Sequence, residues 1–193
     1  MLPDETALDL ITRRDLGALL QGLLERAAAL LGTPHAFIYL LEPDAARMEL
    51  RIATGAFCQR LGQRRARGQG LAGRVWQTGR SLVQEESDGD VQGLSPAGSQ
   101  RLVSRVGVPL SSNEEIVGVL GLASEAASGV FGFDEIAVLS QFARLASVAI
   151  DNAHLHQAMR RELAERHRAE ATLRHNEEVL RRSEARYRGF VEH

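Results

Sequence analysis

The sequence predicts an α+β domain built on an antiparallel sheet and followed by a long helix. Three observations predict this class. An amphipathic helix comes first, the predicted strands follow one another closely enough to pair locally, and helices lie at both ends of the strand-forming region. The chain also changes character near residue 133, because every glycine except Gly189 lies before it and the last proline is Pro109. A turn-rich domain therefore precedes a long stretch without helix breakers.

Composition excludes several classes of function. The 193 residues are 44% hydrophobic and carry a net charge of -2, so no bulk positive charge draws the chain to nucleic acid or to an anionic membrane. All basic residues are arginine, which excludes lysine chemistry such as Schiff bases. A single cysteine excludes an intrachain disulfide and a cysteine-rich zinc site. The acidic first residues do not form a signal peptide, and no segment is apolar enough to span a membrane, so we expect a cytoplasmic protein.

The first elements follow from hydrophobic spacing. Leucines and alanines over 16–31 recur with helical period, and Gly32 and Pro34 end that helix. Residues 36–41 are apolar on both faces, as in a central strand. Met48, Leu50 and Ile52 alternate with charged residues, which predicts a half-buried strand.

The middle of the chain alternates turns with short elements. We expect an irregular segment over 55–70 and then a short helix over 71–78 that ends at Gly79. A short strand over 81–83 and a long polar loop over 85–100 follow. Two further strands, over 102–110 and 116–123, are expected to form a hairpin.

The last helix begins near Asp134 and is apolar as far as Ala153. Beyond His156 the pattern weakens to one residue per heptad: Met159, Arg166, Leu173, Leu180 and Tyr187, with Ala169, Asn176 and Ser183 as their three-residue partners. This spacing favours a weak two-stranded coiled coil with polar residues in its seam. The alternative is a solvated helix that frays.

Three motifs, in order, resemble the GAF domain family. Gly68-Gln69-Gly70-Leu71-Ala72-Gly73-Arg74-Val75, continuing through Gln77-Thr78-Gly79-Arg80, is similar to the central signature of the family. Val106–Leu110, with its hairpin into Ile116–Leu122, is similar to the family's strand pair, and Phe131-Gly132-Phe133-Asp134-Glu135 resembles the entry to its last helix. Together they cover residues 12–157, about three quarters of the chain.

A second resemblance covers the tail. Residues 162–192 resemble a signalling helix that leads into a PAS domain. We therefore expect a GAF domain over 1–157, a coiled-coil signalling helix over 158–184 and the beginning of a PAS domain over 185–193. This arrangement resembles bacterial sensor histidine kinases; a diguanylate cyclase or a transcription regulator is the alternative parent. The segment itself is expected not to be an enzyme, and a GAF-fold methionine-sulfoxide reductase is a further alternative.

The resemblance also implies an architecture. GAF domains have a six-stranded antiparallel sheet with helices behind it and a small-molecule pocket in front, and they commonly dimerise through their first and last helices. It thus implies a homodimer that passes a signal to the downstream PAS and output domains. The residues expected in the dimer or coiled coil are Leu20, Leu24, Leu139, Phe142, Ala146, Ile150, Met159, Leu173 and Leu180.

Pocket candidates are large side chains near the glycine-rich segment and the long loop. They are Phe57, Trp76, Val83 and Leu102, with Arg105 as the charged candidate. Trp76 is better explained as a core residue. No cofactor is required, and the ligand is unknown; cyclic nucleotides and haem are ligands of the family that no residue here supports specifically. A dimer of this kind would relay ligand binding as a population shift between two helix packings.

The spacing Gly68-x-Gly70-x-x-Gly73 also matches the dinucleotide-binding fingerprint. That fingerprint needs a buried strand directly before it, and residues 59–67 are too polar for one. We interpret these glycines as shaping the turn into the short helix. The start of that helix, with Arg64, Arg65 and Arg67 nearby in sequence, either attracts an anion or carries only surface arginines.

Two side chains are candidates for cofactor chemistry. Cys58 is a redox thiol, a bilin attachment site or a small buried residue, and we favour burial because free cysteine usually packs as an apolar group. His35 is the one haem-ligand candidate inside the domain, although a structural histidine is the more common case. His154 and His156 lie two residues apart on a helix, so they do not form a metal pair.

Overall fold

The computed structural model describes residues 4–42, 46–85, 102–112, 114–125 and 131–191, with the backbone alone described at 4–14, 179 and 183–191. Its contacts divide the chain into two compact units, Met1–Asp151 and Asn152–His193. No helix within the described residues is long and apolar enough to cross a membrane.

The first unit is organised by one six-stranded antiparallel sheet. Its spatial order is β3-β2-β1-β6-β5-β4, and every neighbouring pair is antiparallel. The strands are β1 (His35–Leu41), β2 (Met48–Thr54), β3 (Arg64–Arg65), β4 (Leu82–Glu85), β5 (Ser104–Ser112) and β6 (Glu115–Ser124). This is the six-stranded antiparallel sheet of an α+β domain that the sequence predicts.

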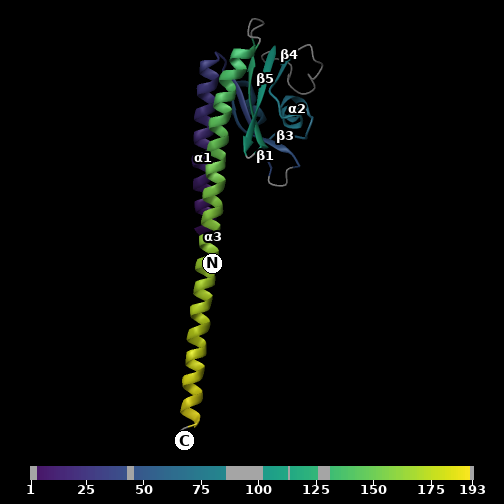
Figure 1. Cartoon of the computed structure of the whole chain (residues 1–193). Helices are drawn as coiled ribbons and strands as arrows, with labels where there is room; N and C mark the ends of the chain where they lie inside the picture. Colours follow the sequence, from purple (N-terminus) through teal and green to yellow (C-terminus); the bar gives the residue numbers. More distant parts are fainter. Residues whose placement is uncertain (1–3, 43–45, 86–101, 113, 126–130, 192–193) are drawn as a thin grey trace. The chain divides into compact units, whose positions relative to one another are not determined.

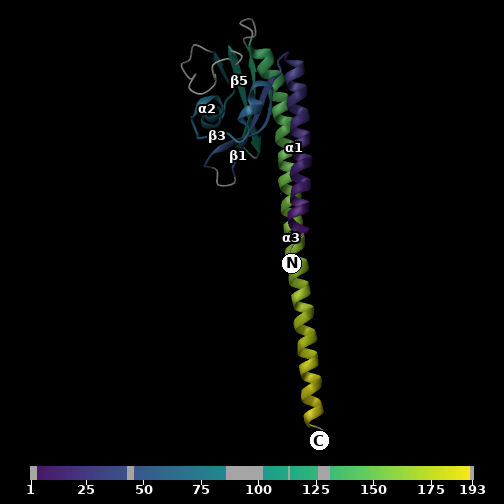
Figure 2. The same cartoon turned by 180° about the vertical axis from the view of Figure 1, so that it is seen from behind.

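Helices cover the two faces of the sheet unequally. Helix α1 (Asp4–Leu30) and the first part of α3 (Phe133–Val191) lie side by side on one face in both views (Figures 1 and 2). Helix α2 (Gly70–Thr78) and the 3-10 helix η1 (Gly55–Arg60) belong to the other side. Helix α1 ends where Gly32 adopts a left-handed conformation with φ of 68°, as a C-terminal glycine commonly does.

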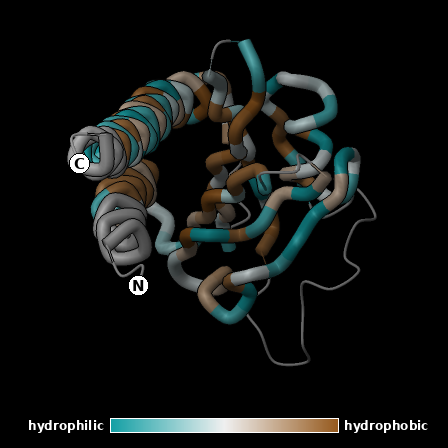
Figure 3. The backbone as a smooth tube through the Cα atoms, turned by 90° about the horizontal axis from the view of Figure 1, so that it is seen from below, coloured by the Kyte–Doolittle hydropathy of each residue, from teal (hydrophilic) through white to brown (hydrophobic). Residues whose placement is uncertain are grey.

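Alternation along the strands produces two separate cores. On β1, Ala36 and Ile38 pack with the helices α1 and α3, whereas Phe37 and Tyr39 pack with α2 and η1. The same division holds on β6, where Leu120 and Leu122 face the long helices. Within the domain, hydrophobic residues are concentrated along the central strands and polar ones toward the periphery (Figure 3). The apolar run over 36–41 is thus explained, because both faces of β1 are covered.

Three elements differ from the sequence prediction. The segment expected to be irregular contains η1 and the two-residue strand β3, whose polar sequence has no alternating pattern to reveal it. The first helix begins at Asp4, earlier than its apolar spacing indicates. The predicted hairpin is present, since Ser112 pairs with Glu115, and Glu114 adopts a φ of 69° within the turn. Most of the predicted loop over 85–100 lies outside the described residues.

The second unit is the part of α3 that begins at Asn152. Its described side chains are mostly exposed, and two ion pairs at i, i+4 spacing run along its surface, Arg166 with Glu170 at 3.2 Å and Arg182 with Glu178 at 2.5 Å. Exposed pairs of this kind contribute only about 0.3–0.5 kcal/mol each. The helix is therefore weakly stabilised by its own surface.

Candidate functional site: a cavity between the sheet and helix α2

A cavity of about 160 Å³ lies on the α2 side of the sheet. Side chains from β1, η1, β3, β5 and the start of α2 enclose it. Its lining residues are Phe37, Tyr39, Phe57, Arg60, Gln63, Arg65, Gln69, Gly70, Leu71, Ala72 and Arg105. Aromatic groups and guanidinium groups therefore meet in one partly open cavity.

The aromatic part of the wall begins on β1. Phe37 packs edge-on against Phe57 with ring centroids 4.8 Å apart, and against Tyr39 at 5.7 Å. The pairing of β1 with β2 shifts register between Ile38 and Tyr39. A bulge of this kind bends a strand and changes the direction of its side chains, and bulges are common beside functional sites. Here the irregularity lies where Tyr39 enters the cavity.

Three arginines line the cavity from three different elements. Arg60 ends η1, Arg65 lies on β3, and Arg105 lies on β5, where it is only 8% exposed. Burial lowers the pKa of Arg60, the phenol of Tyr39 opposes that shift, and the charge of Arg65 adds to it. Arginine stays protonated in proteins even so, and the cavity is consequently positive.

Tyr39 places a hydroxyl among these cations. Burial raises its pKa above the ordinary value, although the charges of Arg65 and Arg60 and a hydrogen bond with Arg65 act in the opposite direction. The phenol is therefore protonated at neutral pH. Its hydroxyl donates to the side-chain oxygen of Gln63 at 3.3 Å.

The glycine-rich turn supplies the remaining wall. Gly68 and Gly70 have φ values of 82° and 63°, and a Cβ on Gly73 would clash with the carbonyl oxygen of Ala66. The N–H of Gly68 donates to the carbonyl of Gly73 at 2.8 Å, which closes the turn into α2. These glycines shape a tight turn, as expected. The buried strand of a dinucleotide site does not precede them, because β3 is short and polar.

Three arginines precede this turn in the sequence, and in the structure each has different surroundings. Arg65 lines the cavity, whereas Arg64 pairs with Glu42 at 2.8 Å and is 58% exposed. Arg67 lies over the ring of Trp76, 5.8 Å from its centroid. Only Arg65 of the three is therefore placed to meet a molecule in the cavity.

Two of the five predicted pocket residues, Phe57 and Arg105, line the cavity. Trp76 and Leu102 pack in the apolar cluster on the same side of the sheet without lining the cavity, and Val83 packs against the cluster on the opposite face. Tyr39, Arg60 and Gln63 were missed by the sequence analysis. The density of arginine over 60–67 is a signal for Arg60 alone, and no local pattern indicates Tyr39 or Gln63.

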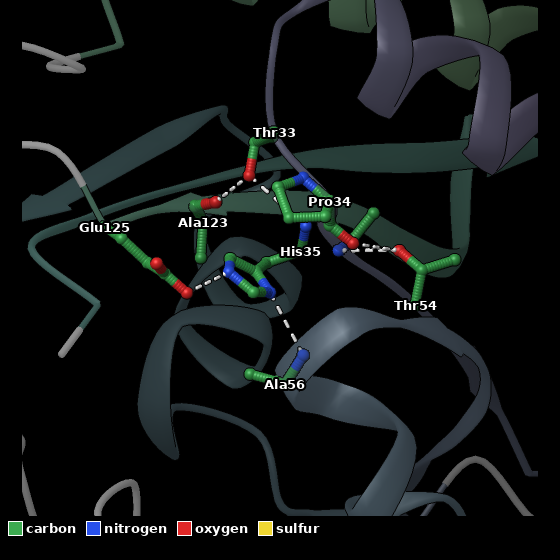
Figure 4. Close-up of polar contacts among 8 residues, drawn as sticks. Thr33, Pro34, His35, Thr54, Ala56, Ala123 and Glu125 are labelled. Carbon is green, nitrogen blue, oxygen red and sulfur yellow. Dashed lines mark hydrogen bonds and ion pairs between the residues drawn. The ribbon is translucent and has the colours of Figure 1, made fainter. Parts of the chain in front are cut away.

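A polar cluster joins this side of the domain to the ends of three strands (Figure 4). His35 lies at its centre, with Nδ1 accepting from the N–H of Ala56 at 3.0 Å and Nε2 paired with the carboxylate of Glu125. Thr33 donates to the carbonyl of Ala123, and Thr54 donates to the carbonyl of Pro34 at 2.8 Å. The cluster fixes the starts of β1 and η1 against the end of β6.

His35 has no ring nitrogen available for a haem iron in this arrangement. Both nitrogens make hydrogen bonds within the protein, and the side chain is only 4% exposed. Its local role is structural, as the more common interpretation of a lone histidine predicts. Among the described residues, no group of three His, Cys, Asp or Glu side chains gathers as metal ligands would.

Cys58 differs from the interpretation favoured by the sequence. It is exposed rather than buried, and its Sγ lies 3.5 Å from the carbonyl oxygen of Ala53. The reason is its position on η1, which directs the neighbouring Phe57 into the core and Cys58 outward.

The residues predicted for a dimer interface divide into two groups. Leu20, Leu24, Leu139, Ala146 and Ile150 are buried in the core beneath the sheet, and Phe142 packs against it. The five buried side chains contact their own chain and present almost no surface to a second copy, whereas Phe142 is half-buried. Met159, Leu173 and Leu180 are more than half exposed.

The exposed faces of α3 carry further apolar residues at related positions. Leu145 and Val148 are each 57% exposed in the first unit, and Leu155 is 60% exposed in the second. In sequence, Leu145, Met159, Leu173 and Leu180 are separated by multiples of seven, and Val148 and Leu155 occupy the companion position. Exposed apolar residues at heptad spacing on α3 thus begin at Leu145, two heptads before Met159, where the predicted pattern starts.

A hydrogen bond also joins the sheet to α3 within the first unit. The hydroxyl of Ser147 accepts from the N–H of Ser111 at 3.0 Å and donates to the carbonyl of Ala143 at 2.9 Å. Arg105 and Ser111 lie on the same strand, β5, so one strand both lines the cavity and contacts α3.

The family model described as a GAF domain matches residues 13–151. No curated protein matches the chain in sequence. Similar solved structures exist at low identity, and they support the fold alone.

Three of these structures show the different kinds of protein in which a similar fold occurs. The GAF domain of a phosphoenolpyruvate-protein phosphotransferase from Acinetobacter has a TM-score of 0.59 at 19% identity, over 80% of this chain and 97% of that one. The second GAF domain of DevS from Mycobacterium smegmatis has a TM-score of 0.59 at 18% identity, over 76% and 99%. A free methionine-R-sulfoxide reductase from Neisseria meningitidis, in complex with its substrate, has a TM-score of 0.55 at 22% identity, over 81% and 96%.

Proposed function

We propose, from the premise that this chain belongs to the GAF domain family, that it is the sensory module of a cytoplasmic signal-transduction protein. GAF domains are regulatory modules of signalling proteins, and that general role applies here. The finer proposal is that a small molecule in the cavity biases the packing of a homodimer. Helix α3 then passes that bias to a PAS domain and an output domain, in the manner of a sensor histidine kinase.

One observation supports this relay above the others. Adjacent residues of the same strands contact the cavity and the long helices, since Phe37 lines the cavity and Ile38 packs with α1 and α3. Packed interiors transmit small displacements because they contain few voids. A ligand that shifts β1 or β5 therefore has a short path to α3.

The proposed dimer contact is the exposed heptad face of α3. The second unit exposes Leu155, Met159, Leu173 and Leu180 with coiled-coil spacing, and a helix of this length with so little apolar contact of its own is stabilised by a partner. Polar seam residues such as Arg166 and Asn176 keep the dimer weak and fix its register. A weak dimer is suited to switching, because its two states differ little in free energy.

Sedimentation of the whole chain tests the dimer. We expect a dimer at micromolar concentration, and Leu173→Glu should weaken dimerisation by at least roughly tenfold by burying a charge in the seam. Ala171→Glu is the matched control, because Ala171 lies outside the heptad positions on the same exposed helix. A wild-type chain that sediments as a monomer overturns the relay.

Crosslinking tests the parallel orientation. With Cys58→Ser as the background, Leu173→Cys leaves one cysteine at the seam. A parallel, in-register dimer brings the two copies of residue 173 within disulfide distance, whereas an antiparallel dimer does not. We expect rapid disulfide formation for Leu173→Cys and little for Ala171→Cys. Equal rates at both positions would contradict a parallel seam.

The parent protein stays a matter of proposal. The sensor histidine kinase rests on the resemblance of residues 162–192 to a signalling helix and PAS entry, and residues 185–191 belong to helix α3. A diguanylate cyclase or a transcription regulator would use the same module. We do not favour a methionine-sulfoxide reductase like the Neisseria protein, because Cys58 is the one cysteine and cannot form an intrachain disulfide.

A further inference from the structure

We propose that the cavity beside α2 binds a small organic anion, a carboxylate with an apolar body about the size of benzene. This inference names the ligand class of the sensory site and rests on the proposed function only for the consequence of binding. Charge, shape and volume each support it, and they come from different residues.

Charge is the first argument. Arg60, Arg65 and Arg105 converge on one cavity, and no Asp or Glu is among the described residues that line it. The guanidinium group binds carboxylates through paired hydrogen bonds, which are stronger than neutral ones. Arg105 is nine-tenths buried, so water screens the attraction between its charge and an anion in the cavity less than it would at the surface.

The arginines also disfavour one another in the empty site. The pKa of Arg60 is lowered first by burial, and the neighbouring charge of Arg65 lowers it further. Like charges held close in a partly buried site repel, and a bound anion removes that repulsion. Tyr39 stays protonated because burial raises its pKa, so it adds no negative charge to the cavity, and its hydroxyl donates to Gln63.

The start of α2 faces the same cavity. Gly70, Leu71 and Ala72 line it, and their backbone N–H groups belong to the first turn, which has no partners inside the helix. The N-cap Gln69 makes no side-chain cap bond, since its amide oxygen accepts from the N–H of Ala66 at 3.1 Å instead. The positive end of the helix thus adds to the positive field of the arginines.

Shape and volume decide the kind of anion. Phe37, Phe57 and Leu71 give the cavity an apolar side that an inorganic ion would not use. Its volume of about 160 Å³ is close to that of cavities which hold benzene, roughly 150 Å³. Pockets for drug-sized ligands measure about 300–1,000 Å³. The part of a ligand that lies inside this cavity is therefore about the size of a benzene ring.

Calorimetric titration with benzoate and benzamide tests the proposal. The two molecules share size and shape, and only benzoate is charged. We expect benzoate to bind and to raise the melting temperature of the whole chain, and benzamide to bind at least roughly tenfold more weakly, because hydrogen bonds to a charged group are stronger than neutral ones.

Two neighbouring arginines provide matched variants. Arg65→Gln should reduce benzoate affinity by at least roughly tenfold, because Arg65 lines the cavity. Arg64→Gln should leave the affinity unchanged, because Arg64 is exposed and pairs with Glu42. Circular dichroism spectra of the two variants check that both remain folded.

Three results would overturn the inference. They are the absence of benzoate binding at millimolar concentration, equal affinity for benzamide, or inorganic phosphate binding as tightly as benzoate. A chain that forms the dimer but does not bind benzoate contradicts only the ligand class. A monomer that binds benzoate through Arg65 contradicts only the relay.

Discussion

The imidazole of His35 accepts a hydrogen bond at Nδ1 from the backbone N–H of Ala56, over 3.0 Å. An N–H group can only donate, so Nδ1 carries no proton and Nε2 holds the hydrogen that reaches Glu125. Ala56 precedes Phe57 and Arg60 on η1, and both of those side chains line the cavity. One buried histidine thus holds a cavity wall against β1 and the end of β6.

Two substitutions of His35 should show how much its hydrogen bond with Ala56 contributes to the free energy of unfolding. His35→Ala should lower the free energy of unfolding by about 2–3 kcal/mol, because it leaves a cavity and removes the acceptor for Ala56. His35→Asn keeps an acceptor near the position of Nδ1 and should recover roughly 1 kcal/mol. Urea unfolding of both variants measures the difference. Equal losses would mean that the Ala56 bond contributes nothing.

Gly121 should tolerate no side chain. A Cβ there would clash with the ring of Phe37 and would lie 2.6 Å from the carbonyl oxygen of Val106. Gly121→Ala should therefore destabilise the domain by about 1–3 kcal/mol through overpacking. Gly17→Ala is the control, since a Cβ on Gly17 in α1 meets nothing within 4 Å. It should stabilise the chain by roughly 0.5–1 kcal/mol. Thermal melts that rank the two variants in the opposite order would contradict this packing.

Tyr39 should make the domain sensitive to alkali. Burial raises its pKa above the ordinary value of 10.0, so the folded state holds the phenol proton more tightly than the unfolded state does. The resulting stability is present in full below pH 10.0 and is lost as the pH rises through the folded-state pKa. Tyr39→Phe should make the decline in free energy of unfolding above that pH shallower. Identical slopes for wild type and variant, measured by urea unfolding across the alkaline range, would exclude this origin.

Much of the fold could be predicted because its signals are local. Leu20 and Leu24 recur with helical spacing, and Met48, Leu50 and Ile52 alternate as a half-buried strand should. Burial in the structure follows these patterns. Strand β3 was missed because two arginines at a sheet edge have no hydrophobic face, and their pairing depends on β2 rather than on their own sequence.

The site was only partly predictable for a different reason. Phe57 and Arg105 were identified from their position near the motif, but which face of the sheet a residue occupies depends on register. Val83 illustrates this, because it lies on the helix side of β4 and cannot reach the cavity. Tyr39 belongs to the run over 36–41, whose sequence is apolar on both faces and does not indicate which side chains reach the cavity; in the structure Tyr39 lies on the α2 side, beside an irregularity in the strand pairing. Similarly, Leu20, Leu24, Leu139, Ala146 and Ile150 are expected at a dimer contact and lie in the core, since one helical stripe looks the same whether a sheet or a second copy covers it. Met159, Leu173 and Leu180 are exposed, and their place in a dimer stays a prediction.

The brevity of β3 has a consequence for solubility. An exposed sheet edge invites strand addition by another molecule, and proteins protect such edges by making them short and charged. Here one edge consists of Arg64 and Arg65 alone. A two-residue strand offers few backbone groups for pairing, so this edge gives another chain little to extend. Arg65 therefore has two roles: its side chain lines the cavity, and its backbone belongs to an edge strand that is too short to pair well with another molecule.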